Sequence, residues 1–551
     1  MRRWGLPEKT EIEGQWMNHV EIKRRRIQTY SYALGAVTLL ILSILTKATG
    51  VAYLAVSAEC YFFATQIVSR SAADCLGRLL RGRLSKGQYK NAANMRRNAM
   101  LLEAALGAAA GVLLFACAKP LAEYVFSMPD SLLLIRMFAP AVFLRTISGV
   151  LQGYFQGDGS ELPTAVTVVL RQVFVLGFAV LFCSILKDYG EKVSALLGRE
   201  EFTYLYGAAG AAAAVILSEI LVILFLLFIY KSSSRPVKRP DEGMKTTESF
   251  LDMVKALYGS MGLYILTGLL ERLPIWLGLV FFQKSHSGGG LGTESYGIFY
   301  GQYLAFCMVF ISFISASMLP SMRRIMQCMK KEEQRPAKNC FQAGIHVAWA
   351  KTLFFTVFTA SMSDQIAGIL QHERQEALAQ MLRFGSGIIL FSVFALYFKG
   401  ILFIWGRKYY VIGCLGISNM VFAVTAVLFL NVQGAGVVSL VYAGLFGSAI
   451  YCGGTGFLVF RRLGMGIRPV QIFLVPAGAA AGAGLLSFLL GRLLTPHLGE
   501  TVCALLGFAA SFLLYWGILS ALRNFKEQEL AAAQAGPVLK LIAKAFPRVN
   551  V

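Results

Sequence analysis

The chain has 551 residues, of which 56% are hydrophobic and 15% are charged, and its mean hydropathy is +0.60. This composition excludes an ordinary soluble protein. Its formal net charge is +22, but Lys and Arg lie between apolar runs of about twenty residues, long enough to cross a bilayer. The charge therefore indicates membrane topology, and nucleic-acid binding is not expected.

Apolar runs recur along the whole chain and predict an all-α polytopic membrane protein with about fourteen transmembrane helices. The first run follows a polar N-terminus without a small-residue cleavage site, so we read it as a retained helix and expect no signal peptide. The predicted spans are 28–48, 50–70, 98–118, 131–153, 164–186, 206–230, 254–282, 297–320, 340–361, 380–405, 409–430, 436–460, 469–491 and 502–522.

Basic residues are distributed unevenly between the two sides of these spans. With the N-terminus inside, the predicted cytoplasmic segments hold 37 of the 52 Lys and Arg residues and the outer loops hold 8. This excess predicts a protein of the cytoplasmic membrane with both termini in the cytoplasm. The basic loops are expected to contact anionic lipids. Among these segments are a basic N-terminus (1–27), a linker (231–253) and a tail (523–551), which could hold an interfacial helix or be disordered.

Two stretches of the chain are similar to each other. Residues 134–157 resemble 381–406, and the basic loop 70–97 corresponds to 320–338 at a similar offset. An even number of helices per repeat gives both copies the same orientation. We therefore expect an N-terminal lobe (28–230) and a C-terminal lobe (254–460), two parallel six-helix repeats around a central cavity. Residues 461–522 would add two further helices.

Several ionisable residues fall deep inside the spans, where a charge is costly and usually faces a partner or a water-filled path. Two interpretations are open. One is neutralisation across helices, with Arg145 or Arg171 paired with Glu59 or Glu219. The other is an anion-binding vestibule in which guanidinium forks hold phosphate oxygens. Arg136, Arg383 and Glu103 are closer to span ends and are expected to snorkel. The deep residues are Glu59, Arg145, Arg171, Glu219, Glu271, Arg272, Lys351 and, at the margin, Lys399.

The connection LQGYFQGDGSELPTAV, residues 151–166, carries no Lys or Arg, unlike the other predicted cytoplasmic connections. Its glycines, at 153, 157 and 159, permit positive φ angles, Ser160 is a candidate helix cap, and Pro163 suits a first helical turn. We expect this segment to pack against protein as part of a gate. The predicted gate-loop residues are Gly153, Tyr154, Phe155, Gln156 and Gly157.

The same motif, GYFQG followed by PTAV, resembles a signature of the polysaccharide exporter branch of the multidrug/oligosaccharidyl-lipid/polysaccharide (MOP) superfamily, which includes stage V sporulation protein B-like and MurJ-like lipid II flippases. GRLLRGRLSKGQYKNA (77–92) and ASMLPSM (316–322) are similar to further motifs of that family. The resemblance implies fourteen helices in two lobes and transport of an undecaprenyl-pyrophosphate-linked saccharide by alternating access. Helix 5 carries Arg171 and Val175 where the family has an acidic residue and then an arginine, so lipid II, teichoic and capsular precursors are all admissible.

These observations lead to three functional hypotheses. The first is a flippase for an anionic lipid-linked saccharide, with Arg145, Arg171, Arg272 and Lys351 binding substrate and Glu59, Glu219 and Glu271 orienting them or carrying protons. The second is a cation-coupled multidrug antiporter of the related MATE branch, and the third is a scaffold for glycan-synthesis enzymes. The coupling ion, H⁺ or Na⁺, stays open. Enzymatic activity, a cofactor and a metal site are not expected, and the ten cysteines are interpreted as packing residues.

Overall fold

The computed structural model describes residues 19–69, 72–233, 248–285, 290–331, 333–371, 375–431, 436–463, 470–522 and 524–525. These residues form helices and connections, with no strand among them. Fourteen of the described helices are long and apolar enough to cross a membrane, which confirms the predicted all-α polytopic fold. Helices satisfy their own backbone hydrogen bonds, as hydrocarbon requires. Most of the predicted linker and tail, residues 234–247 and 526–551, lie outside the described residues.

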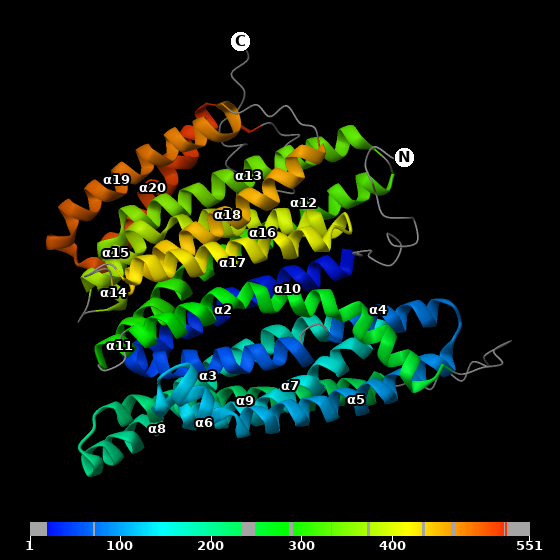
Figure 1. Cartoon of the computed structure of the whole chain (residues 1–551). Helices are drawn as coiled ribbons and strands as arrows, with labels where there is room; N and C mark the ends of the chain where they lie inside the picture. Colours follow the sequence, from blue (N-terminus) through cyan, green and yellow to red (C-terminus); the bar gives the residue numbers. More distant parts are fainter. Residues whose placement is uncertain are drawn as a thin grey trace. The chain divides into compact units, whose positions relative to one another are not determined.

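The chain divides into two compact units between Gly301 and Gln302. We call the described residues up to Gly301 the N-terminal unit and those from Gln302 the C-terminal unit. The N-terminal unit consists of α2 (His19–Leu45), α3 (Lys47–Val68), α4 (Ala72–Ser85), α5 (Tyr89–Ala116), α6 (Ala118–Pro120), η1 (Leu121–Val125), η2 (Pro129–Ser131), α7 (Leu132–Gly157), α8 (Leu162–Leu197), α9 (Glu201–Ser233), α10 (Phe250–Ser285) and α11 (Gly290–Ile298) (Figure 1).

Helices α8 and α9 pack side by side along their length and exceed the thickness of a membrane. A β-carbon at Gly210 of α9 would lie 2.5 Å from the backbone of Phe182 in α8, so a small residue is needed there. With 36 residues, α8 is about 54 Å long, whereas the hydrocarbon core is about 30 Å thick. The predicted spans 164–186 and 206–230 therefore cover only part of these helices, and α8 ends at Gly198 in the left-handed conformation.

The C-terminal unit begins within the π-helical segment η3 (Phe299–Leu304) and holds the remaining helices. Here the predicted span 380–405 is divided, because α15 ends at Gly385 and α16 starts at Gly387. These helices are α12 (Ala305–Lys330), α13 (Gln334–Ser361), α14 (Ser363–Leu370), α15 (Gln375–Gly385), α16 (Gly387–Ile404), α17 (Lys408–Leu430), α18 (Val438–Leu463), η4 (Val470–Leu474), α19 (Val475–Leu498) and α20 (Glu500–Ala521).

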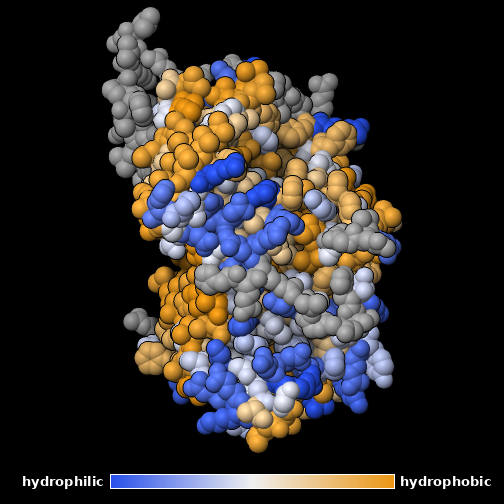
Figure 2. Space-filling model, turned by 90° about the vertical axis from the view of Figure 1, so that its left-hand side faces the viewer, coloured by the Kyte–Doolittle hydropathy of each residue, from blue (hydrophilic) through white to orange (hydrophobic). Residues whose placement is uncertain are grey.

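Large apolar side chains remain exposed on many helices, as lipid contact demands. Val112 on α5, Phe228 on α9 and Leu513 on α20 are each about 70% exposed. In the view of Figure 2, which faces one end of the helices, hydrophilic residues gather on that end and hydrophobic residues cover the flanks. This pattern fits a multi-pass membrane protein. All ten cysteines are free thiols.

The boundary between the two units differs from the boundary expected between two lobes, which was placed in 231–253. Helix α10 follows that linker, yet it packs against α3, α4, α5 and α11 of the N-terminal unit. The physical reason is close approach: a β-carbon at Gly268 of α10 would lie 2.0 Å from the Gln66 amide of α3. The two parallel six-helix repeats and the cavity between them stay predictions.

Candidate functional site

Two of the predicted anion-binding residues share one carboxylate inside the N-terminal unit. Arg145 of α7 and Arg171 of α8 both contact Glu219 of α9, with Nη1 to Oε1 at 3.3 Å and Nε to Oε1 at 2.7 Å. Ser148 donates a hydrogen bond to the other Glu219 oxygen at 3.1 Å. The Glu219 side chain is 1% exposed. Two guanidiniums against one carboxylate leave this cluster with one positive charge that has no counterion within it.

A second cluster joins α3, α10 and the start of η3. Arg272 places Nη1 2.8 Å from Oε1 of Glu59, and the same oxygen accepts a hydrogen bond from the Tyr300 hydroxyl at 2.9 Å. The Arg272 guanidinium also lies over the Phe62 ring, 4.5 Å from its centroid. Here one cation meets one anion, so the neutralising interpretation describes this pair well.

Tyrosines place the two clusters near each other. Tyr32 of α2 interacts electrostatically with both Arg145 and Arg272, and Tyr61 of α3 interacts with Arg145, Arg171 and Glu219. The side chains of Arg145 and Arg272 are 26% and 25% exposed. Together the clusters hold three guanidiniums and two carboxylates, with a net charge of +1.

Two other predicted residues are not among the cluster contacts described above. Glu271 is half-buried on α10, next to Arg272 in sequence. Lys351 belongs to α13 of the C-terminal unit, where its Nζ donates a hydrogen bond to Ser317 Oγ at 3.2 Å. Their proposed roles rest on the sequence alone.

The predicted gate loop is helical. Residues Gly153, Tyr154, Phe155, Gln156 and Gly157 form the last turns of α7, and all five are buried. The helix continues because its glycines allow α4 to approach: a β-carbon at Gly157 would lie 2.6 Å from Leu80 Cβ. The expected positive φ occurs at Gly159 alone of the three glycines. Ser160 does not cap α8, whereas Pro163 does stand in its first turn.

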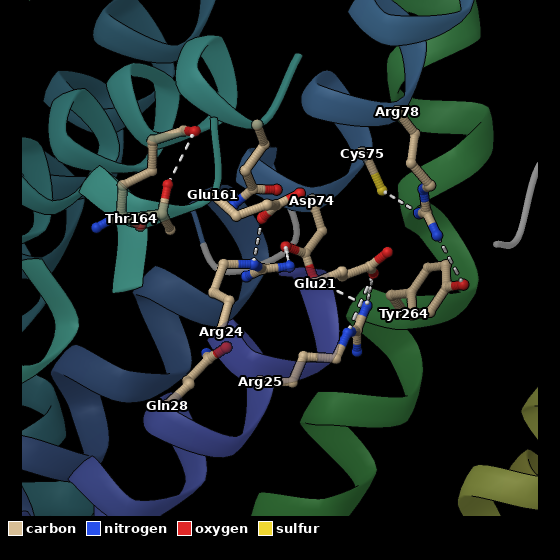
Figure 3. Close-up of polar contacts among 12 residues, drawn as sticks. Glu21, Arg24, Arg25, Gln28, Asp74, Cys75, Arg78, Glu161, Thr164 and Tyr264 are labelled. Carbon is tan, nitrogen blue, oxygen red and sulfur yellow. Dashed lines mark hydrogen bonds and ion pairs between the residues drawn. The ribbon is translucent and has the colours of Figure 1, made fainter. Parts of the chain in front are cut away.

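The connection between α7 and α8 carries no Lys or Arg because its acidic residues bind arginines from other helices of the N-terminal unit. Glu161, after α7, is 2.7 Å from both Arg24 of α2 and Arg81 of α4, and Asp158 pairs with Arg96 of α5. Arg24 also reaches Asp74 of α4 at 3.0 Å, so it bridges two carboxylates (Figure 3). The acidic residues of this connection thus form ion pairs with arginines of α2, α4 and α5. A Lys or Arg in the connection would repel those arginines.

The same network extends to α10. Arg78 of α4 donates a hydrogen bond to the Tyr264 hydroxyl at 3.3 Å and lies over the Tyr264 ring (Figure 3). Sequence reasoning missed Arg24, Asp74 and Glu161 as a unit because they belong to three separate connections. The sequence signal for this network was the acidic connection before α8, which stands among basic cytoplasmic segments.

Of the three residues expected to snorkel, Glu103 does not. Because α5 begins at Tyr89, Glu103 lies in the middle of that helix, and it is 0% exposed. Arg136 and Arg383 are exposed; Arg136 lies over the Phe115 ring, and Arg383 binds Asp364 at 2.7 Å.

Known proteins resemble this chain in sequence. No protein-family model matches it. The chain is 26% identical over 267 residues to Lipid II flippase MurJ of Bacillus subtilis (strain 168), with 46% of this chain and 47% of that protein covered. It is 23% identical over 291 residues to Stage V sporulation protein B of the same organism, with 52% and 53% covered. The chain thus spans about half the length of the curated relatives it matches.

Solved structures are similar over more of the chain. A lipid II flippase MurJ in an inward closed conformation superposes with a TM-score of 0.61 and 11% identity, covering 90% of this chain and 98% of that one. An inward-facing multidrug resistance MATE family transporter of the MOP superfamily gives a TM-score of 0.54 and 13% identity, covering 82% and 96%. The resemblance predicted from the GYFQG motif is confirmed: the chain is similar in sequence to MurJ and Stage V sporulation protein B, and it has the fold of MOP-superfamily transporters.

Proposed function

We propose that this protein is a flippase that moves an anionic lipid-linked saccharide across the cytoplasmic membrane by alternating access. The observation that carries the proposal is the surplus cation of the Arg145–Arg171–Glu219 cluster. A buried charge without a counterion is costly and is usually retained for a ligand or a pathway. A pyrophosphate-linked headgroup, such as that of an undecaprenyl-pyrophosphate precursor, supplies the missing negative charge and matches the guanidinium fork.

Arg145 is the residue most able to reach such a ligand, because its side chain is partly exposed and its contact with Glu219, at 3.3 Å, is the looser of the two. Arg171 is held more tightly and would orient Glu219. Arg272, also partly exposed, would bind once its contact with Glu59 opens. Lys351 is a further proposed substrate-binding residue, and Glu271 a proposed proton carrier.

The test uses purified protein in liposomes with a fluorescent undecaprenyl-pyrophosphate-linked saccharide, whose outer-leaflet pool is quenched by a membrane-impermeant reagent. Replacing Arg145 and Arg171 by alanine alone would leave Glu219 buried without a cation, so the informative variant is R145A/R171A/E219Q, which is neutral throughout. Hydrogen bonds to charged groups contribute about 1.5–3 kcal/mol each, so we expect flipping to fall at least tenfold.

The matched control is R199A, because Arg199 is an exposed arginine between α8 and α9 with a half-exposed side chain. Its flipping rate should equal that of the wild type. Folded R145A/R171A/E219Q protein that flips at the wild-type rate would refute the proposed role of the cluster.

A second candidate function is a cation-coupled multidrug antiporter, because the fold is similar to that of a MATE transporter. A carrier of organic cations needs carboxylates that are available to the substrate, whereas Glu59 and Glu219 are engaged by arginines. Expression in a drug-sensitive host should therefore leave tolerance to cationic dyes unchanged. Raised tolerance that is lost in E219Q would favour the antiporter.

We also propose that both termini face the cytoplasm, as the excess of basic residues in alternate loops predicts. On that orientation Gly198, at the turn between α8 and α9, is outside, and Lys86, after α4, is inside. Single cysteines at these positions in a cysteine-free background should react in intact cells at 198 and only after permeabilisation at 86. The reverse pattern would invert the topology.

A further inference from the structure

Glu103 is a buried carboxyl group that the proposed anion site does not use. It is 0% exposed in the middle of α5, and one oxygen, Oε1, accepts a hydrogen bond from the Tyr258 hydroxyl of α10 at 3.1 Å. The other oxygen, Oε2, is buried and has no hydrogen-bond partner among the described residues. Its helix neighbours Ala99, Met100 and Leu102 belong to or pack against an apolar core.

No cation neutralises this carboxyl group within the described part of the chain. The helices packed against α5 include α3, α4, α7 and α10, and arginines of α4, α5 and α7 contact other groups. Arg96 pairs with Asp158, Arg78 binds Tyr264, and Arg145 pairs with Glu219. In the part of the chain that the structure describes, the side-chain contact of Glu103 is with Tyr258. Glu59 and Glu219, by contrast, each meet at least one guanidinium.

An isolated carboxylate is strongly disfavoured in apolar surroundings, and such a group takes up a proton instead. Among the described residues, the contact at this point joins Glu103 to the Tyr258 hydroxyl, and Oε2 of Glu103 has no hydrogen-bond partner. Hard metal cations gather more oxygen ligands than this. The chemistry of the site therefore fits a proton as its ligand.

The partner of Glu103 lies on a helix that polar contacts attach to the rest of the N-terminal unit. Besides Tyr258, Tyr264 accepts from Arg78 of α4, and its carbonyl oxygen accepts from Gln66 of α3 at 3.4 Å. About two turns further along α10, Arg272 binds Glu59. Displacement of α10 from α5 would admit water to Glu103, and hydration of the carboxyl group favours the ionised form.

We propose that Glu103 is a proton-binding site whose occupancy depends on the position of α10. The carboxylic acid keeps its proton while Tyr258 is docked. When α10 moves away, the O–H bond breaks, the proton passes to water and a carboxylate remains on α5. Protons would in this way stabilise the docked arrangement, since a ligand shifts an equilibrium by its differential affinity for the two states. A role of this site in driving transport rests on the proposed flippase function.

The site itself can be tested without any transport assay, by infrared spectroscopy of the purified full-length protein at neutral pH. We expect a carboxylic-acid C=O band that shifts in D₂O and is lost in E103Q, whose neutral amide conserves shape and hydrogen bonding. Y258F keeps the acid but removes its donor, so the band should move and persist. E191Q, on the exposed end of α8, is the matched control and should leave the band unchanged. Identical carboxylic-acid regions in wild type and folded E103Q would overturn the proposal.

Coupling is tested separately in the liposome assay with an imposed proton gradient. The gradient should change the flipping rate of the wild type, and the E103Q rates with and without it should be equal. A sodium gradient that replaces the proton gradient with equal effect would overturn the assignment of the ligand. An equal response of wild type and E103Q to the proton gradient would overturn the coupling. If the wild type flips no lipid at all, the proposed flippase function fails while the infrared result still decides the protonation of Glu103.

Discussion

Replacing Glu219 should destabilise the protein much more than replacing Arg171, although the two side chains contact each other. The reason is the count of charges. R171M leaves Arg145 and Glu219, which form a neutral pair, whereas E219Q leaves two guanidiniums facing each other without a carboxylate. The contacts involved are short, 2.7 Å for Arg171 and 3.3 Å for Arg145.

The magnitudes follow from the burial of this cluster. Two unit charges about 4 Å apart interact by about 4 kcal/mol at an effective dielectric constant of about 20. Removing one partner of a buried ion pair typically costs about 3–5 kcal/mol, and we expect this loss of unfolding free energy for E219Q. R171M loses hydrogen bonds to a charged group but also removes repulsion from Arg145, so its net cost should be about 1–2 kcal/mol.

Denaturant titration and thermal unfolding of the detergent-purified variants measure these differences. The double variant R171M/E219Q holds one unpaired guanidinium instead of two, so adding R171M to E219Q should recover part of the lost stability. The reasoning is refuted if R171M costs as much as E219Q, or if the two losses simply add.

Three further variants test the packing and the polar networks. G77A should lower the free energy of unfolding by about 1–3 kcal/mol, because its β-carbon would lie 2.7 Å from Gln156 Cβ. G82A in the same helix meets open space, so it should be neutral or slightly stabilising in the same unfolding assay. R24A should cost about 1.5–3 kcal/mol, because Glu161 and Asp74 each lose a contact with Arg24 but keep one with Arg81 or Arg25. R25A, whose side chain is 36% exposed, should cost less than about 1 kcal/mol, and equal losses would contradict this. Y300F removes one donor to Glu59 and should cost about 1 kcal/mol, and an unchanged melting temperature would argue against that hydrogen bond.

The spans were predictable because run length and hydropathy are local properties of the sequence. The residue at which α7 ends was not predictable, because a glycine such as Gly157 is compatible with a turn or with a close helix contact. The choice between them depends on Leu80, which lies on another helix. The division of the chain at Gly301 was missed for a similar reason: the assignment of α10 depends on contacts such as Gln66 with Tyr264, 198 residues apart.

The deep charges were identified by position, but their pairing was not. Sequence placed Arg145, Arg171 and Glu219 in neighbouring spans, and it could not tell which carboxylate each arginine would choose. Glu103 was misjudged because its distance from the end of α5 depends on where the helix starts, and that is Tyr89 rather than the first apolar residue. Its partner, Tyr258, is 155 residues away and gives no local signal.

The length of α8 and α9 has a consequence for how motion in this protein can be observed. Near Gly198 the surface of α8 carries Asp188, Glu191 and Lys192, all exposed, and these charges prevent that end from sinking into hydrocarbon. The end of the hairpin near Gly198 therefore extends beyond the hydrocarbon. When the two helices rock about a pivot at the bilayer midplane, the tip at Gly198 sweeps a wider arc than any residue within the lipid. A spin label or fluorophore at that tip would magnify a rotation too small to resolve at the pivot itself.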